Sequence, residues 1–553
     1  MCRVGAETTF HTTRGCNAMI TRNALPCFLL LTGSAFAQNA AVTVAIDANA
    51  SRHAISPLIY GVAFGAEADL KTLNAPLNRS GGNNMSTYSY ANNAQNLDAD
   101  WYFESYPQGS AAPGAEQDAF VMSSKAGGAA PMLTVPLIGW VAKLGPNQTI
   151  LPSFSVKKYG AQCSTDYNYF PDAGDGIKAN CKTNITGNDK NDAYIPDTSA
   201  NEQVWIKHLI AAWGKANAGG VGYYLMDNEP SIWFSTHRDV HPVGPHADEY
   251  RNKVLTESAD IRRLDKSALI LAPEEWGWDG YFYSGYDQQY TSKHGYSYFP
   301  DLTTEQGGVS YIPWLLSEWK AKHAIDVLSV HFYPQGGEYG SDNSTATQLL
   351  RNRSTRQLWD PNYVSESWIG APVYLIPRLQ GWISSYYVVG TPVAITEYNW
   401  GDEANINGAT TQADIYGIFG QQALYLATRW TVPGNTTPTF KAMQMYRNYD
   451  GKNSGFGDTS VSATVPNPDD LSAFAAQRTS DGAITVMVIS KVLSGTTPVT
   501  LSLANIPATG TAKRWQLTSA NAISPLSGLN WSGGKLSDTV PAQSVTLYVL
   551  PTK

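Results

Sequence analysis

The sequence of 553 residues has few charges, few cysteines and no excess of basic residues. Charged residues make up only 15% of it, and 38 Lys and Arg stand against 46 Asp and Glu, which gives a net charge of -8 at pH 7. Proteins that bind nucleic acid usually present a concentrated basic surface to the phosphates. The composition therefore argues against nucleic acid as a partner. With 43% hydrophobic residues, the chain is long enough for one large core and a second, smaller one.

The sequence also lacks a long uninterrupted apolar run. The apolar segment at residues 24–31 is too short to span a bilayer. It follows Arg22 and precedes Ala35-Phe36-Ala37, which has the small-residue pattern of a signal-peptidase site. We therefore predict that residues 1–37 are a signal peptide, with Met19 as an alternative start, and that the protein is secreted and has no membrane partner.

Only two of the five cysteines, Cys163 and Cys181, lie beyond this predicted leader. Export places thiols in an oxidising environment, where pairs of cysteines commonly form disulfides. We predict a bridge that closes one loop, while two free thiols remain the alternative. Neither cysteine has the spacing of a metal-binding finger.

Aromatic residues are abundant, with 16 Trp and 31 Tyr. Most of these rings are expected to serve ordinary packing. Aromatic rings also offer large flat apolar faces, on which the C–H faces of sugars can stack. The surplus of Trp and Tyr therefore favours a carbohydrate ligand.

Short apolar segments alternate with segments of helical periodicity through most of the chain. The predicted strands are residues 59–64, 77–80, 132–136, 221–226, 268–272, 327–332, 393–396 and 442–446. The predicted helices are residues 204–216, 248–264, 314–323 and 412–428. Eight strands that alternate with helices are typical of a (β/α)₈ barrel, so we predict an α/β fold of the TIM-barrel class.

From about residue 470 the sequence pattern changes to short β-rich runs separated by Gly, Pro, Ser and Asn. The runs at 483–492, 499–503, 512–517 and 544–550 predict a small antiparallel β-sandwich. Residues 41–46 alternate like an isolated strand that would complete this sandwich. The predicted parts are a leader at 1–37, an N-terminal sandwich strand within 38–56, a catalytic barrel at 57–468 and a C-terminal sandwich at 469–553.

Two of the predicted strands end in a glutamate. Glu229 follows the strand at 221–226, and Glu397 follows the strand at 393–396. Active sites of (β/α)₈ barrels lie at the carboxyl ends of the strands. Cleavage of a glycosidic bond needs two carboxyl groups, one protonated and one ionised. A single glutamate after a strand is often a helix cap or a surface charge, but two of them in an aromatic-rich chain favour a glycosidase.

The barrel segments resemble glycoside hydrolase family 44, whose members are endoglucanases and xyloglucanases. The resemblance is carried by YGVAFG at Tyr60, NRSGGNN at Asn78, DWYFES at Asp100, KYGAQCSTD at Lys158, PDAGDG at Pro171, DNEPSIWFSTHRDVHP at Asp227, EEWGW at Glu274, SVHFYPQ at Ser329 and ITEYNWG at Ile395. It implies a (β/α)₈ barrel with a β-sandwich built from both termini. It also implies a retaining mechanism, with Glu229 as acid/base and Glu397 as nucleophile.

Polar residues near the same strand ends are candidates for substrate binding. Arg79 would hold Glu397 ionised, although a packing salt bridge is an alternative. Asn228 would hydrogen-bond the 2-hydroxyl of the sugar, or it only caps the strand end. His331 and Tyr333 would orient the nucleophile, although a buried histidine satisfied by backbone groups is a common structural case.

Tryptophans in the same loops are candidates for stacking on sugar rings. Those that leave strand ends are Trp276, Trp278 and Trp400, and Trp101 and Trp233 are outer candidates. Two glutamates of the same rim, Glu274 and Glu275, receive no catalytic task from the family motif.

One structural metal ion is expected. The loop from Asp172 to Asp175 has hard oxygen ligands and tight turns, which suit calcium, although it lacks the EF-hand pattern. The family resemblance implies a calcium ion near this loop, joined by Glu104. A plain surface loop is the alternative, and no cofactor is expected in catalysis.

Together these features predict a secreted, monomeric, retaining endo-β-1,4-glucanase. Its expected partners are β-glucan polysaccharides, namely cellulose derivatives, xyloglucan and related chains. Two alternatives remain open, a related barrel glycosidase that acts on xylan or mannan, and a noncatalytic glycan-binding protein with a degenerate barrel.

Overall fold

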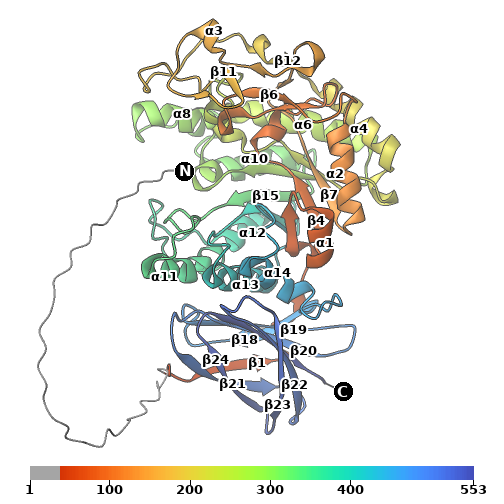
Figure 1. Ribbon diagram of the computed structural model, residues 1–553, viewed down its shortest axis with the longest axis vertical. Helices are drawn as coiled ribbons and strands as arrows, with labels where there is room; N and C mark the ends of the chain where they lie inside the picture. The colour runs from red at the N-terminus through yellow and green to blue at the C-terminus, as the bar shows by residue number, and fades with distance from the viewer. Residues whose placement is uncertain (1–37, 553) are drawn as a thin grey trace, which may run out of the picture. The chain divides into compact units, whose positions relative to one another are not determined.

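The computed structural model describes residues 38–552, and most of them form a closed barrel with surrounding helices (Figure 1). Its eight parallel strands follow one another around the barrel in chain order. They are β3 (Gly61–Ala63), β4 (Leu77–Ser80), β7 (Ala130–Val135), β13 (Tyr223–Met226), β14 (Leu269–Glu275), β15 (Val327–Phe332), β16 (Val393–Tyr398) and β17 (Leu426–Arg429). The predicted fold class is confirmed, while the predicted leader lies outside the described residues.

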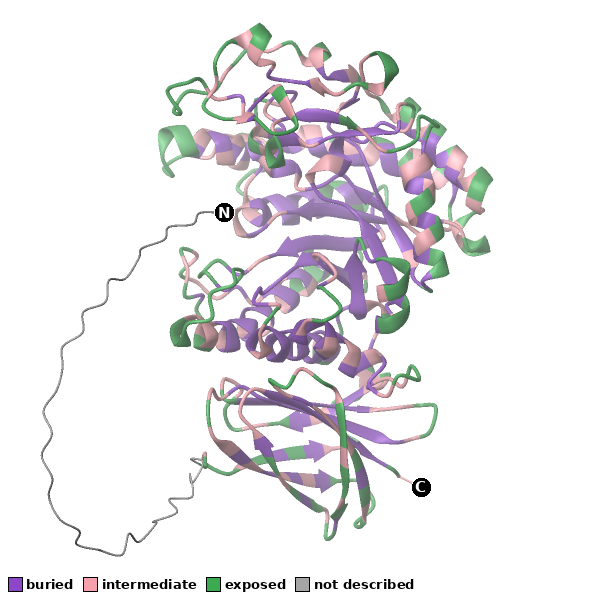
Figure 2. Ribbon diagram, viewed as in Figure 1, coloured by how far each residue is buried: buried purple, intermediate pink, exposed green. Residues whose placement is uncertain are grey.

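Helices follow the barrel strands and cover them from outside (Figure 2). The longer ones are α2 (Ala115–Ala126), α4 (Ser199–Trp213), α6 (Ala247–Leu264), α8 (Gly285–His294), α10 (Tyr311–Lys320), α11 (Thr345–Ser354), α12 (Leu375–Tyr386), α13 (Ile406–Gln421) and α14 (Pro438–Arg447). The shorter ones are α1 (Glu67–Leu73), α3 (Val156–Tyr159), α5 (Trp233–Thr236), α7 (Trp278–Phe282) and α9 (Pro300–Thr304). The predicted helices at 204–216, 248–264 and 314–323 correspond to α4, α6 and α10.

The interior of the barrel changes from apolar to polar along the strands. A layer of apolar side chains fills the centre, with one residue from each of seven strands: Leu77, Met132, Leu225, Leu271, Val327, Ala394 and Leu426. Because side chains alternate between the faces of a strand, Arg79 shares the inner face with Leu77, and His331 shares it with Val327. The same strands therefore build a packed floor and place polar groups above it, at their carboxyl ends.

The eighth barrel strand is not the one predicted from the sequence. Residues 442–446 belong to helix α14, which begins with Thr437 as N-cap and Pro438 at its first turn. The eighth strand is β17, which overlaps the end of the segment 412–428 that was predicted as one helix. The helix of that segment, α13, already ends at Gln421. The short run at residues 442–446 contains only one polar residue, Gln444, and so resembled a buried strand. The Thr-Pro pair is the start signal that distinguishes the two readings.

A β-rich domain is built from both ends of the described chain. Strand β1 (Val42–Asp47) runs parallel to β21 (Thr496–Ala504) and antiparallel to β18 (Thr459–Thr464). The predicted contribution of the N-terminal strand to this domain is thus confirmed. The other strands are β2 (His53–Ala54), β19 (Leu471–Gln477), β20 (Ile484–Ser490), β22 (Gly510–Leu517), β23 (Ser524–Trp531), β24 (Lys535–Pro541) and β25 (Ser544–Leu550).

Helix α13 of the barrel packs against this domain, where it contacts β19, β20 and β25. Val486 and Val488 of β20 face the core of the β-rich domain, whereas Met487 and Ile489 face the core that includes α13. The strand is therefore buried on both faces. Gly417 permits this close approach, because a Cβ at this position would overlap the ring of Phe474 on β19.

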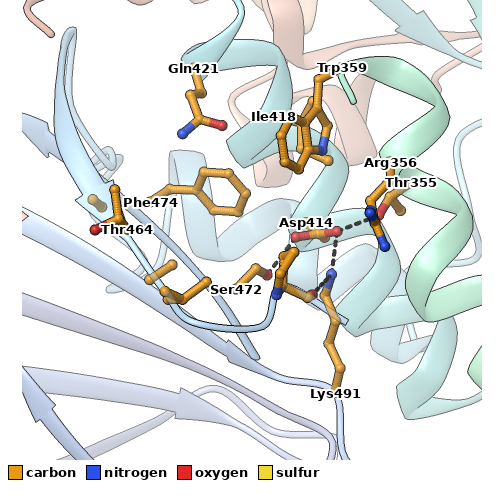
Figure 3. Close-up of a pocket in the computed structure, with 14 residues that line it drawn as sticks. Thr355, Arg356, Trp359, Asp414, Ile418, Gln421, Thr464, Ser472, Phe474 and Lys491 are labelled. Atoms are coloured by element: carbon orange, nitrogen blue, oxygen red, sulfur yellow. Dashed lines mark hydrogen bonds and ion pairs between the residues drawn. The ribbon is translucent and has the colours of Figure 1, made fainter. Parts of the chain in front are cut away.

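A buried ion pair lies in the same interface (Figure 3). The carboxylate of Asp414 on α13 accepts hydrogen bonds from Lys491 Nζ at 2.6 Å, Thr355 Oγ1 at 2.7 Å and Ser472 Oγ at 2.5 Å. Asp414 is 1% exposed and Lys491 3%. A cavity of about 260 Å³ adjoins this cluster and is also lined by Trp359, Ile418 and Phe474.

Small sheets in the loops extend the rim of the barrel. They comprise β5 (Ala94–Asn96), β6 (Glu104–Pro107), β8 (Trp140–Ala142), β9 (Leu151–Pro152), β10 (Thr165–Asp166), β11 (Phe170–Gly174) and β12 (Tyr194–Pro196). Cys163 and Cys181 are joined by a disulfide in this region, so the predicted bridge is confirmed. Across residues 38–552, no helix combines the length and hydropathy that a membrane span requires.

Candidate active site

Glu229 and Glu397 meet at the carboxyl end of the barrel. Glu229 follows β13 and precedes a 3₁₀ turn (Pro230–Ile232), and Glu397 lies in β16 beside its register partner His331 of β15. One carboxylate oxygen of each glutamate and one ring nitrogen of His331 all lie within 4.8 Å of one another. The fold thus brings together two carboxyl groups that are 168 residues apart in the sequence.

Two donors hold the carboxylate of Glu397. Arg79 Nη1 donates to Oε1 at 2.6 Å, and the hydroxyl of Tyr333 donates to Oε2 at 2.8 Å. Arg79 is fully buried and Glu397 is 5% exposed. A charge-assisted bond and a second bond in a water-poor site stabilise the ionised form of a carboxyl group. Arg79 and Tyr333 therefore occupy the positions predicted for residues that keep Glu397 charged and oriented.

Glu229 has a different environment. Its pKa is raised by burial above all, with a further contribution from the negative charge of Glu397, while His331 and Arg79 oppose the increase. His331 Nδ1 lies 2.8 Å from Glu229 Oε1. A carboxyl group that is buried beside another carboxylate retains its proton at higher pH than an exposed one. The two glutamates thus differ in environment: Glu397 is held by two donors, whereas burial raises the pKa of Glu229.

Asn228 is fixed next to Glu229 by several hydrogen bonds. Its Oδ1 accepts from Arg79 Nη2 at 3.1 Å and from the backbone N–H of Gly82 at 3.2 Å, and its Nδ2 donates to Asn83 Oδ1 at 3.3 Å. The buried carboxylate of Asp227 accepts the backbone N–H of Asn228 at 2.7 Å. Asn228 is therefore a rigid part of the site and more than a strand cap.

Three residues close to the site have a left-handed backbone conformation. Asp227, Glu229 and Glu274 have φ values of 67°, 47° and 57°, which are in the left-handed region. Residues other than glycine adopt this conformation at a cost of about 1–3 kcal/mol each, and they do so most often at functional sites. The hydrogen bond from Glu229 N to Glu274 O, 3.0 Å long, joins two of these residues.

Glu274 and Glu275 are both buried at the rim of the site, and Glu274 contacts its charged residues. Glu274 is fully buried, and its Oε2 lies 3.4 Å from Arg79 Nη2 and 3.3 Å from His331 Nε2. Glu275 is also fully buried, accepts from Ser231 Oγ at 2.5 Å and has a pKa raised to about 8, chiefly by burial. Their position directly after a predicted buried strand is the signal that could have identified them.

Two of the predicted sugar-stacking tryptophans are in the core. Trp233 is fully buried and donates to the carbonyl of Asn228, and Trp400 is 2% exposed and donates to Ser354 Oγ. Neither ring can stack on a sugar, and the expectation for both is corrected. Their indole faces are used for packing because their loops fold back under the rim. Trp276 and Trp278 are partly exposed, and Trp101 is 43% exposed.

Exposed aromatic residues lie on two opposite sides of the site. Near Trp101, the ring of Tyr169 is 6.3 Å away, and Asp100 accepts from Asn83, the partner of Asn228. Beyond Tyr333, the ring of Tyr339 is 5.3 Å away, and Trp368 donates to Gln335. The first group follows β4 and β7 and the second follows β15, which is opposite β4 in the eight-stranded barrel. Sequence patterns did not single out Tyr169, Tyr339 or Trp368.

Trp430 was missed because the eighth strand was misplaced. It directly follows β17, and the guanidinium carbon of Arg79 lies 5.9 Å from the centre of its ring. Phe64 contacts the same ring edge to face at 5.5 Å. A correct assignment of β17 would have placed this tryptophan at the carboxyl end of a barrel strand, next to the glutamates.

The predicted metal ligands do not form one group. Asp172 accepts from Ser155 Oγ and from the backbone N–H of Lys157, and Asp175 accepts from the N–H of Ile177. Within residues 38–552, Glu104, Asp172 and Asp175 are not a set whose ligand atoms lie within 4.8 Å of one another. Asp166 also accepts turn N–H groups, so such bonds do not by themselves exclude a cation ligand. The predicted trio differs because its ligand atoms do not come together.

Glu104 itself has the environment of a cation ligand. It is 2% exposed, and its Oε1 has no hydrogen-bond partner among the described residues. Its pKa is raised to about 8, first by burial and then by the negative charge of Asp166. Two buried neighbouring carboxyl groups fit a cation better than does the predicted trio.

Comparison with known proteins gives concordant matches. The model of glycoside hydrolase family 44 matches residues 94–336. Endoglucanase A of Paenibacillus lautus is 32% identical over 462 residues, which are 79% of this chain. The chain spans 61% of the length of that relative.

Two solved structures extend these matches to the whole described fold. CelM2, a bifunctional glucanase-xylanase from a metagenome library, is 57% identical, with a TM-score of 0.92, and the match covers 93% of this chain and all of that one. A family 44 xyloglucanase from Paenibacillus polymyxa, solved with xyloglucan, is 26% identical, with a TM-score of 0.76 and coverage of 93% and 100%.

Proposed function

We propose, since this chain belongs to glycoside hydrolase family 44, that it is a secreted enzyme that hydrolyses internal β-1,4 linkages of glucans with retention of configuration. The membership confirms the family and the enzyme class predicted above. The observation that carries the mechanism is the approach of the Glu229 and Glu397 carboxylates to within 4.8 Å. Retaining glycosidases hold their carboxyl groups about 5–5.5 Å apart, and inverting ones about 6.5–9.5 Å.

The first step forms a covalent intermediate. A carboxylate oxygen of Glu397 attacks the anomeric carbon while the bond from that carbon to the glycosidic oxygen breaks. Glu229 gives its proton to the departing oxygen. Arg79 and Tyr333 support this assignment, because their donors stabilise the carboxylate of Glu397 before the attack.

The second step releases the sugar. A water oxygen attacks the anomeric carbon, the ester bond to Glu397 breaks, and Glu229 accepts the proton of the water. The ester has removed the negative charge that had helped to keep Glu229 protonated. The same carboxyl group can therefore act first as an acid and then as a base.

The preferred substrates are soluble β-1,4-glucans and xyloglucan. The Paenibacillus polymyxa relative was solved with xyloglucan, and the aromatic groups around Trp101 and Tyr339 support contact with a long chain on both sides of the cleavage point. Xylan is the second candidate, because CelM2 is described as a glucanase-xylanase. A monomeric state remains part of the proposal.

A structural calcium ion is also part of the proposal. Glu104 would bind it together with Asp166, near the loop that contains Asp172 and Asp175. The unpartnered Glu104 oxygen supports this placement. The ion would hold the rim loops together and would take no part in the chemistry.

A panel of soluble polysaccharides tests the proposed activity. The purified protein should release reducing ends from carboxymethyl-cellulose, β-glucan or xyloglucan and lower their viscosity early in the reaction. The matched variant Glu397→Gln keeps the shape of the site and should lose at least about 10³-fold in kcat. Equal, low sugar release by both proteins would instead support a noncatalytic glycan-binding protein.

A further inference from the structure

The hydrogens around Arg79 and His331 can be counted. Arg79 Nη2 carries two hydrogens, and its acceptors are Asn228 Oδ1 at 3.1 Å and Glu274 Oε2 at 3.4 Å. The same nitrogen is 3.3 Å from His331 Nε2. With both Nη2 hydrogens engaged, none remains for a lone pair on His331 Nε2. Nε2 then need not accept from Arg79, and it can carry a hydrogen of its own that Glu274 Oε2 accepts at 3.3 Å.

Both ring nitrogens of His331 face carboxylate oxygens. Nδ1 lies 2.8 Å from Glu229 Oε1, and Nε2 lies 3.3 Å from Glu274 Oε2. A neutral imidazole could donate only one hydrogen bond, whereas an imidazolium donates two. The geometry fits the charged form, and Glu274 provides the acceptor that this form needs.

We propose that Glu274 is a positioning residue that keeps both nitrogens of His331 protonated and so holds the imidazole against Oε1 of Glu229. The other oxygen of Glu229 is then left to carry the proton that the leaving group receives. The inference rests on the proposed function and extends it to a residue that does not touch the substrate.

The charges around His331 support this assignment. The titratable groups that face it from the surrounding elements are Arg79, Glu229, Glu274, Glu275, Tyr281, Tyr333 and Glu397. Burial lowers the pKa of His331, but Glu397, Glu229 and Glu274 together raise it to about 9. Burial alone would raise the pKa of Glu274. His331 and Arg79 outweigh burial and lower this pKa below its usual value.

The positive ring also matters in the second step. While Glu397 is esterified, the imidazolium favours the ionised form of Glu229, which is the form that accepts a proton from water. Without the charge of Glu274, the protonated form of His331 should be less stable, above all while Glu397 is esterified and its own charge is absent. Deglycosylation should then be slowed more than the first step.

Glu274→Gln tests the proposal, with Glu275→Gln as a matched control, because Glu275 is an equally buried neighbour. NMR titration of the His331 imidazole, assigned with His331→Asn, should show a doubly protonated ring through neutral pH in the wild type. In Glu274→Gln the titration should fall by at least about one pH unit. Glu274→Asp retains a carboxylate and should keep the ring charged, which also provides a second variant if Glu274→Gln does not fold.

Kinetics give the second readout. On an aryl glycoside with a good leaving group, Glu274→Gln should lower kcat about tenfold with a smaller loss in kcat/KM, because the second step is slowed. The basic limb of kcat/KM on a glucan should move to higher pH, because Glu229 loses the nearby cation. An unchanged His331 titration, or a loss of rate that is equal at every pH, would overturn the proposal. The titration needs no turnover, so an inactive wild type would refute the proposed function alone.

Discussion

Arg79 and His331 show how a few buried side chains give two chemically identical glutamates different electrostatic environments. Arg79 neutralises charge beside Glu397 and Glu274, and His331 lies between all three carboxyl groups. Leaving one partner of a buried charged group unpaired costs several kcal/mol, so these contacts depend on one another. The roles proposed for Glu229 and Glu397 thus follow from environment and not from residue type.

Replacing Glu229 with alanine should separate the two steps. With a 2,4-dinitrophenyl glycoside, whose leaving group needs no proton, Glu229→Ala should keep a fast first step and a slow second step. Azide should restore turnover and give a β-glycosyl azide, because a small anion replaces the water that Glu229 no longer activates. If azide altered neither the rate nor the product, the acid/base role would belong to another residue.

The pH profile follows from the same residue. Burial raises the pKa of Glu229, and activity requires its protonated form, so kcat/KM of the wild type should fall as pH rises through that value. This fall is expected on a glucan, whose leaving group must be protonated. On the 2,4-dinitrophenyl glycoside, whose leaving group needs no proton, the basic limb should be absent from the wild type and from Glu229→Ala alike. An equal fall of kcat/KM on both substrates would mean that a group other than Glu229 controls it.

Among single residues, strand ends were sufficient to predict which polar side chains meet around Glu229 and Glu397, but not which aromatic rings lie near them. Glu229, Glu397, Arg79, Asn228, His331 and Tyr333 follow or end apolar runs, so their common edge could be inferred. Trp233 and Trp400 also follow such runs, but their rings turn inward. The direction of a side chain after a strand depends on loop packing, which a single sequence does not reveal.

Among the elements, those buried on all sides were the hardest to assign. The run at β20 is apolar at consecutive positions because helix α13 covers its outer face. Residues 442–446 of helix α14 are mostly buried and include only one polar side chain, Gln444, and they were therefore predicted as a strand. Periodicity identifies an element only when one of its faces is polar, so caps must decide such cases.

The loop region beside the disulfide gives a prediction for calcium. If Glu104 binds the ion, chelation should lower the melting temperature of the wild type and have no effect on Glu104→Gln, because the variant has no buried charge that needs a cation. Differential scanning calorimetry with added calcium or with chelator would measure this. A melting curve of the wild type that chelator leaves unchanged would discard the metal.

For the whole molecule, the buried ion pair of Asp414 and Lys491 lies at the contact between the barrel and the β-rich domain. Asp414→Ala would leave Lys491 buried without its partner and should destabilise the protein by about 3–5 kcal/mol. Asp414→Ala with Lys491→Met should recover much of this loss. Glu67→Ala removes an exposed pair and serves as control, with an expected change of about 0.5 kcal/mol or less.

Urea unfolding of these variants would measure the differences. Equal stability of Asp414→Ala and the double variant would contradict the assigned cost of an unpaired lysine. A large loss in Glu67→Ala would indicate that the exposed pair is also important. The β1 strand, which precedes the barrel and pairs with β18 and β21, makes both ends of the described chain part of this stability.

The stereochemistry of the first product tests the central claim, that Glu229 and Glu397 act by double displacement, most directly. Proton NMR can follow the anomeric signals during the first minutes of hydrolysis of a soluble cello-oligosaccharide or xyloglucan oligosaccharide. Two carboxyl groups as close as those of Glu229 and Glu397 predict that the β-anomer appears first and later mutarotates. Initial release of the α-anomer would contradict the account.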